Sequence, residues 1–179
     1  KLFDLIEQAR TESLGRLTEQ GLAQDYPQTE REEIARQVGL AAIKYADLKN
    51  QRLTNYIFDL ARFTQFEGET GPYLQYQAVR IQSLLKKAED QGFKPGPIQI
   101  EDAAERDLVL LLDRLPDAID QAIAKRAPNV LADHAFSVAQ AFSRFYAAHH
   151  ILSETNTALR SSRLAVSRLV LTQFAVVLA

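Results

Sequence analysis

Apolar residues recur at intervals of three and four positions along most of this 179-residue chain. That spacing places them on one face of an α-helix, whereas a half-buried strand requires strict alternation. No strand pattern of useful length occurs, because the run Tyr56–Phe58 is short. We therefore expect an all-α protein, a multi-helix bundle with short connections. The expected helices cover residues 1–22, 29–48, 72–90, 102–113, 116–126, 129–152 and 156–178.

Capping and helix-breaking residues mark the expected helix ends. Thr29–Glu32 has the spacing of a capping box, and the carboxylates of Glu101–Asp102 stand where a helix start favours negative charge. Phe66–Gly71 is a loop by composition, and Pro72 suits the first turn of the helix that follows. Gly92–Pro97 contains two glycines and two prolines and is the clearest internal break.

Composition excludes several classes of protein. Apolar residues make up 46% and charged residues 25%, which is typical of a globular protein and not of a disordered one. Cysteine is absent, which excludes disulfides, cysteine–zinc sites and cysteine nucleophiles. Methionine is absent even at position 1, so we expect a piece of a longer protein. Polar residues interrupt the apolar stretch Leu164–Ala179, which predicts a buried helix and no membrane span.

The charge is uneven along the chain. The formal net charge is −2, yet residues 125–179 hold six basic residues against Asp133 and Glu154. The three histidines, His134, His149 and His150, lie in the same part. This asymmetry hints at an anionic partner.

Catalytic signatures are missing. The sequence has no phosphate-binding P-loop, no dinucleotide fingerprint and no His-Glu-x-x-His motif. His149 and His150 are adjacent, so on a helix they point about 100° apart and cannot share a metal. His150 and Glu154 are four positions apart, but no third ligand is in view. We predict no catalytic residue and no metal site.

Two helices carry a second stripe beside their apolar face. Tyr73, Tyr76 and Arg80 form one, with residue types suited to base stacking and phosphate contact. Tyr146 and His150 belong to the other, where a partner can reach them. The pattern alone favours a tyrosine rim on a half-buried helix over RNA binding.

His149 is predicted as a core-edge histidine with one hydrogen bond. On the last helix, Arg160, Arg163 and Arg168 form either a solvated basic face or one that meets phosphates.

Several runs of residues belong to one recognisable pattern: Val38–Leu48, Asn50–Arg52, Tyr56–Asp59, Phe66–Tyr76, Phe142–Tyr146, Ile151–Leu152 and Arg163–Ala165. Together they closely resemble the carboxy-terminal part of arginyl-tRNA synthetases, a family of class I aminoacyl-tRNA synthetases. The resemblance covers essentially the whole chain.

The resemblance implies an all-α bundle of the class I synthetase anticodon-binding type. Residues 1–65 correspond to a helical junction after the catalytic domain, and residues 66–179 to the anticodon-binding bundle. Members of the family are ligases that attach arginine to its tRNA with ATP and magnesium, in cytoplasmic protein synthesis. The family's His-x-Gly-His and Lys-Met-Ser-Lys type motifs are not in this sequence, so the chain alone is expected to be inactive and without a cofactor. Its implied partners are an arginine tRNA and the rest of the synthetase chain, with no membrane and no DNA.

The resemblance also implies which residues meet the tRNA. The positions that match anticodon-loop contacts are Phe66, Glu67, Gly68, Glu69, Thr70, Gly71, Tyr73, Tyr76, Tyr146 and His150. His150 departs from the tryptophan that some members have there, although a histidine can still stack. The arginines placed to hold phosphates are Arg80, Arg144, Arg160 and Arg163. Glu67 and Glu69 are a difficulty, since a carboxylate beside a phosphate backbone is unfavourable.

Two other functions stay open. A helical protein–protein docking domain is the main alternative, and the balanced net charge suits it. A small self-contained helical enzyme is disfavoured by the missing motifs. Salt dependence separates the first two, because tRNA binding weakens steeply with salt and apolar docking does not.

Overall fold

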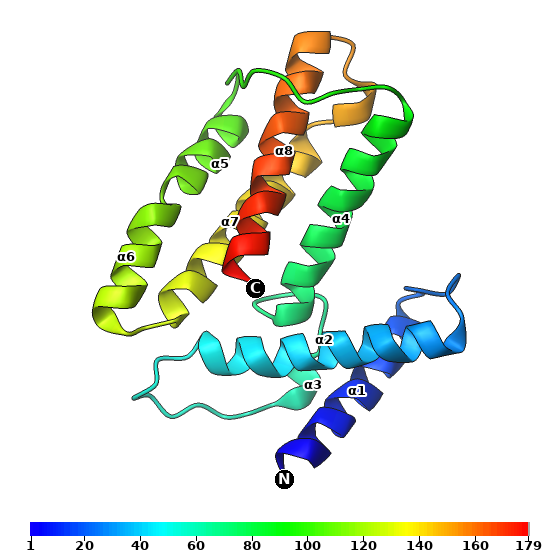
Figure 1. Cartoon of the computed structure of the whole chain (residues 1–179), viewed down its shortest axis with the longest axis vertical. Helices are drawn as coiled ribbons and strands as arrows, with labels where there is room; N and C mark the ends of the chain where they lie inside the picture. Colours follow the sequence, from blue (N-terminus) through cyan, green and yellow to red (C-terminus); the bar gives the residue numbers. More distant parts are fainter. Residues whose placement is uncertain (179) are drawn as a thin grey trace. The chain divides into compact units, whose positions relative to one another are not determined.

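The computed structural model describes residues 1–178, in which helices and loops alternate and no strand occurs, so the predicted all-α class is confirmed. Contacts between residues divide the chain into two compact units, Lys1–Tyr76 and Gln77–Ala179. We call them unit 1 and unit 2. The helices are α1 (Leu2–Glu19), α2 (Gln28–Leu48), α3 (Leu60–Phe63), α4 (Gly71–Asp90), α5 (Ala103–Asp113), α6 (Leu115–Lys125), α7 (Asn129–Ala148) and α8 (Thr157–Val177), with a short 3₁₀ turn, η1 (Ile151–Ser153), before α8 (Figure 1).

Unit 1 is built on the pairing of α1 with α2. The two backbones come close at Gly39, where an added Cβ would lie 2.8 Å from the carbonyl carbon of Ala9. Small residues at this crossing let the helices approach. Beside it, Leu17, Ala35 and Val38 form an apolar cluster that also includes Phe66.

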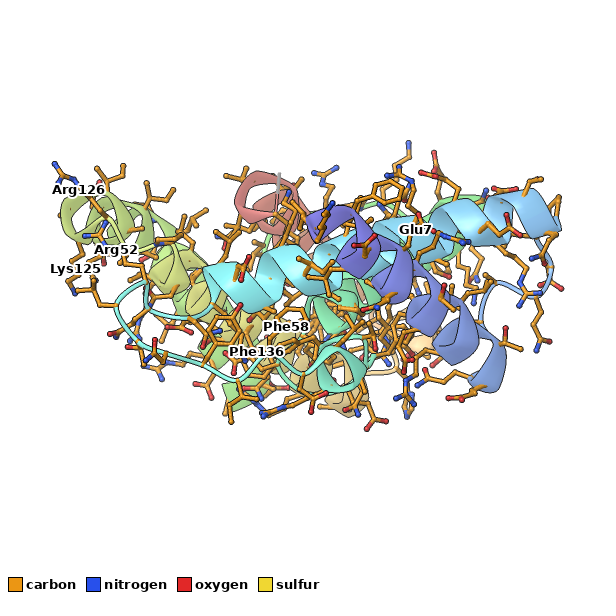
Figure 2. The ribbon with its side chains drawn as sticks, turned by 90° about the horizontal axis from the view of Figure 1, so that it is seen from below. Glu7, Arg52, Phe58, Lys125, Arg126 and Phe136 are labelled. Carbon is orange, nitrogen blue, oxygen red and sulfur yellow. The ribbon has the colours of Figure 1, made fainter. Side chains whose placement is uncertain are left out.

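The loop between α2 and α3 is held by aromatic side chains. The Tyr56 hydroxyl donates to the carboxylate of Asp47, and the rings of Phe58 and Phe63 pack edge to face, with centroids 5.2 Å apart. Figure 2 shows Phe58 on this loop. The outer positions Leu53 and Ile57 are about 91% and 90% exposed. The β-like run of the sequence is therefore a loop, and the short helix α3 after it was not predicted.

Unit 2 is organised around α7, which packs against α5, α6 and α8 (Figure 1). Phe142 and Phe145 of α7 are completely buried, as are Leu108 of α5 and Leu164 of α8. The apolar stripes predicted for these helices therefore form the core. Lys125 and Arg126, by contrast, are exposed and project at the far end of α6 (Figure 2).

The segment between α4 and α5 lies along α8. The backbone N–H of Gly96 donates to the Ser161 carbonyl at 3.0 Å, and that of Gln99 donates to Ser162 Oγ at 2.8 Å. These contacts make Gly92–Pro97 part of unit 2. The expectation of an internal boundary there is wrong, because glycine and proline shape a loop that is bound along its length.

Two predicted helix ends are also corrected. Helix α2 begins at Gln28 with Pro27 at its N-cap and no side-chain cap, so the Thr29–Glu32 box does not form. Helix α7 ends at Ala148, four residues earlier than predicted. The capping role at the start of α5 is confirmed for Asp102, whose side chain accepts from the backbone N–H of Glu105.

Candidate functional site

The turn before α4 contains six of the predicted contact positions, and several of them are buried. Phe66 is only 9% exposed and packs into the apolar cluster with Leu17, Ala35 and Val38. Its ring is thus part of the core of unit 1. A base cannot stack on it without opening that core.

Thr70 caps helix α4. Its hydroxyl donates to the Gln65 carbonyl at 2.6 Å and accepts from the Tyr73 backbone N–H at 3.1 Å. The side chain is 4% exposed. Thr70 closes the turn and begins the helix, which is a structural task.

Gly71 is a packing position. An added Cβ would lie 2.2 Å from the carbonyl oxygen of Ala41 and 2.6 Å from its carbonyl carbon. The start of α4 therefore rests directly on the backbone of α2, and only glycine fits.

The exposed tip of the turn is Glu67 and Gly68. Gly68 has a φ of +71°, a left-handed conformation that glycine adopts without strain. Glu69 behind it is paired, because Lys49 Nζ donates to its Oε2 at 2.9 Å and to its carbonyl at 3.3 Å. The lysine offsets the charge of Glu69, which leaves Glu67 as the carboxylate that an approaching anion meets.

Tyr73 and Tyr76 lie three positions apart in the first turns of α4, and both are half-buried. Tyr76 packs partly against the apolar cluster around Phe66. The two tyrosines of the predicted stripe thus lie in unit 1, with Tyr76 at the edge of its core, whereas Arg80 lies in unit 2.

Unit 2 holds the other aromatic position at the end of α7. The Tyr146 ring is half-buried, and the guanidinium carbon of Arg80 lies over it, 5.5 Å from the ring centroid. A cation over an aromatic face is attracted to the ring electrons. Arg144 and His150 are exposed nearby in the sequence. This end of α7 thus combines an aromatic ring with basic side chains.

The two histidines do not continue the helix as predicted. His149 has extended backbone angles, φ −122° and ψ 121°, and its ring bonds back to the Phe145 carbonyl at 2.7 Å. Its Nε2 is also 2.6 Å from Asp102. His149 therefore has two partners instead of one, and His150 starts the following turn instead of extending the Tyr146 stripe.

Arg163 was predicted to hold a phosphate, but its position gives it another task. The side chain is buried, Nε donates to Glu105 at 2.7 Å, and a terminal nitrogen donates to Glu154 at 2.7 Å. Two carboxylates therefore occupy the guanidinium, which leaves little of it to hold a phosphate.

Arg160, one turn before Arg163, is half-buried. Its guanidinium lies 3.8 Å from the centroid of the Phe93 ring and donates to the Glu154 carbonyl at 2.7 Å. Part of this guanidinium is engaged, although less completely than that of Arg163.

Asp102, Glu105 and His149 form a compact group whose oxygen and nitrogen atoms lie within 4.8 Å of one another. The Glu105 oxygen that lies 3.7 Å from His149 is the one that accepts from Arg163. A guanidinium therefore stands where an added cation would have to bind. Sequence reasoning missed this group apart from the cap, because His149 lies 47 positions after Asp102 and no local pattern joins them.

A shallow hollow of about 480 Å³ lies on unit 1, lined by Glu7, Gln8, Thr11, Glu12 and Leu60. Two carboxylates line it, so it does not suit a polyanion.

Two models of known protein families match this chain, one in each half. The family model described as the DALR anticodon binding domain matches residues 74–179. The model of the class I (R) tRNA synthetase catalytic domain matches residues 1–60.

Relatives agree with these matches. An arginine–tRNA ligase of Maricaulis maris is 53% identical over 173 residues, which is 97% of this chain and 29% of that protein. An arginine–tRNA ligase of Proteus mirabilis is 37% identical over 170 residues, again 29% of its length. The chain thus spans less than a third of the relatives that it matches.

Solved structures show the same fold. The arginyl-tRNA synthetase of Thermus thermophilus superposes with a TM-score of 0.87 at 28% identity, covering 99% of this chain and 30% of that one. The Plasmodium falciparum enzyme superposes at 0.84 with 21% identity, covering 99% and 31%, which supports the fold alone.

No helix in the part of the chain that the structure describes is long and apolar enough to cross a membrane. The resemblance to arginyl-tRNA synthetases is confirmed by the relatives at high identity. Since the DALR match covers more than half of the sequence, this chain belongs to the family of DALR anticodon binding domains.

Proposed function

We propose that this chain is the tRNA-binding part of an arginine–tRNA ligase and that it binds the anticodon loop of an arginine tRNA. The observation that carries the proposal is the match of residues 74–179 to an anticodon binding domain. The relatives named arginine–tRNA ligase, which cover both units, support the choice of amino acid. We place the junction to the catalytic domain within residues 1–65.

The residues proposed to meet bases are those with reachable faces. They are Glu67, Gly68, Tyr73 and Tyr76 in unit 1, and Tyr146 and His150 in unit 2. Single-stranded loops are recognised by stacking bases on aromatic faces and bonding their edges, and each stacked base contributes about 1–3 kcal/mol. The backbone carbonyl of Glu69 accepts from Lys49 Nζ, and this hydrogen bond helps to hold the same turn in place. Phe66, Thr70 and Gly71 shape the turn from beneath.

Phosphate contacts are proposed for Arg80, Arg144 and Arg160. Arginines hold phosphates without distinguishing sequence, so they set the position of the loop while the bases specify it. Arg144 is the most exposed of the three. Arg80 is held over Tyr146, so a phosphate and a base can be bound side by side there.

The chemistry of arginine attachment belongs, in this proposal, to the rest of the ligase chain. That part supplies the sites for ATP and magnesium, and this chain by itself has no aminoacylation activity. The proposed place of action is the cytoplasm, and neither a membrane nor DNA is a partner.

A fluorescence titration of this chain with an arginine tRNA tests the proposal, run at two salt concentrations. We expect salt-sensitive binding that weakens when the anticodon bases are changed. The variant His150→Ala should weaken binding without affecting folding, because the side chain is exposed. Equal binding of all tRNAs, or none, would contradict the proposal.

One observation favours a second function, docking onto another protein surface. Leu53 and Ile57 are almost fully exposed on the α2–α3 loop, and apolar side chains in that state suit a protein partner. The partner that fits this proposal is the rest of the ligase chain. Binding of this chain to the rest of the ligase chain that is insensitive to salt, and that is lost in Ile57→Ser, would support this second function.

A further inference from the structure

A buried group of charges connects three helices of unit 2 at the end of α7. Glu105 of α5 and Arg163 of α8 have side chains 2% and 9% exposed, and His149, which follows α7, is 5% exposed. Asp102 at the start of α5 and Glu154 before α8 complete it from the more open side. Charges that are removed from water in this way must satisfy one another.

The two contacts of His149 determine where its protons are. The Phe145 carbonyl oxygen only accepts, so Nδ1, at 2.7 Å, must donate to it. An ionised carboxylate also only accepts, so Nε2, at 2.6 Å from Asp102, must donate as well. A neutral imidazole has one N–H and can make only one of these bonds. Two donated bonds require the imidazolium cation.

The alternative places a proton on Asp102, and its surroundings oppose that. Asp102 is the N-cap of α5, and its other oxygen accepts from the Glu105 backbone N–H at 3.0 Å. This backbone hydrogen bond, followed by the bond from His149, holds the pKa of Asp102 below its usual value. A helix N-terminus also favours the charged carboxylate.

The charged groups that face His149 also favour its positively charged form. Asp102 and Glu105 approach it from α5, and Glu154 joins through Arg163 of α8. With a neutral His149 the group would hold three carboxylates and one guanidinium. The imidazolium brings it within one charge of neutrality, and it stands at the C-terminal end of α7, where a cation is stabilised.

We propose that His149 is a positioning residue held as an imidazolium, and that this cation fixes the end of α7 and with it the base-contacting side chains of Tyr146 and His150. The inference rests on the proposed function for its effect on tRNA. His149 itself touches no RNA. It ties the backbone just before His150 to Asp102 at the start of α5, and it is also the C-cap of the helix that carries Tyr146.

Nitrogen NMR of the histidine rings tests the charge directly, on this chain at about pH 7. We expect both ring nitrogens of His149 to be protonated. A ring with one protonated nitrogen would overturn the proposal. Asp102→Asn is the matching variant, because asparagine caps helices as well as aspartate but lacks the charge. In it, His149 should lose its second proton.

Titration with an arginine tRNA then tests the positioning. We expect Asp102→Asn to bind about fivefold more weakly, at the low end of the coupling seen between linked sites. Asp107→Asn makes the same change at an exposed place on α5 and should bind as the parent chain does.

If Asp102→Asn removes the second ring proton of His149 but leaves tRNA binding unchanged, the positioning role is overturned. If the parent chain shows both protons and binds no tRNA, the proposed function fails and the positioning role with it, while the charge on His149 stands.

Discussion

At the scale of single residues, Gly71 is the position where the fold tolerates least change. A Cβ there would meet the Ala41 backbone at 2.2 Å, and a carbonyl group cannot move aside as a side chain can. We expect Gly71→Ala to lower the free energy of unfolding by about 3 kcal/mol, as forced overpacking does. Urea denaturation measures it.

Gly15→Ala is the control for that change. Gly15 stands in the exposed interior of α1, with nothing within 4 Å of an added Cβ. Here alanine should raise the free energy of unfolding by about 0.5–1 kcal/mol, because glycine weakens a helix interior. Equal effects of the two substitutions would show that the close approach to Ala41 is absent in solution.

Tyr56 gives a residue-scale prediction at high pH. Its hydroxyl donates to the Asp47 carboxylate, and this bond, together with burial and the negative charge, raises the pKa of Tyr56 to about 12. The stabilisation is complete below the unfolded value of about 10 and is lost as the pH rises toward the folded value.

Ultraviolet absorbance of the phenolate checks this. The difference between the parent chain and Tyr56→Phe should show a phenolate appearing near pH 12. A difference that is complete by about pH 10 would contradict the hydrogen bond to Asp47.

At the scale of helices, Arg163 ties α8 to α5. Removing it takes the nearest cation away from Glu105, whose side chain is 2% exposed and keeps only the more distant His149, 3.7 Å away, as a charged neighbour. We expect Arg163→Met to lower the free energy of unfolding by about 3–5 kcal/mol. Adding Glu105→Gln to that variant should recover part of the loss, which urea denaturation of the three chains would reveal. A double variant with a lower free energy of unfolding than Arg163→Met alone would show that Arg163 and Glu105 are not energetically coupled.

Helix positions were largely predictable, and helix ends less so. The long apolar stripes of α4, α7 and α8 follow a period that the core requires. The end of α7 was missed because Tyr146 to His150 continues the helical pattern, while His149 has extended backbone angles and its ring bonds back to the Phe145 carbonyl, which also accepts the His149 backbone N–H. A hydrogen bond between a side chain and the backbone leaves no trace in periodicity.

The site was predictable only in part, for a related reason. Resemblance selects positions in the turn before α4, but burial separates Glu67 and Gly68 at its tip from Phe66 and Thr70 beneath. Likewise, an arginine on a helix looks the same in sequence whether it faces phosphate or carboxylate. The task of Arg163 follows from its hydrogen bond to Glu105, 58 positions earlier in the sequence, and no local pattern contains that partner.

At the scale of the whole molecule, the proposed function requires a chain of net charge −2 to attract a polyanion with local charge. Six basic residues in 125–179 supply it, but the structure divides them by task. Arg163 is paired with Glu105 and Glu154 and Arg160 is partly engaged with Phe93, whereas Arg144 is exposed. Binding strength should therefore depend on a few arginines and not on the total.

The salt dependence of tRNA binding separates these tasks. Each phosphate contact contributes about 0.7–0.9 to the slope of log affinity against log salt. We expect Arg144→Ala to make the slope shallower by about that amount, and Arg163→Met to leave it unchanged where the variant is folded. Arg126→Ala is the control, because Arg126 is also exposed but precedes α7, while Arg144 is near its end. A slope reduced equally by Arg144→Ala and Arg126→Ala would mean that charge acts at a distance, without a bound phosphate at the end of α7.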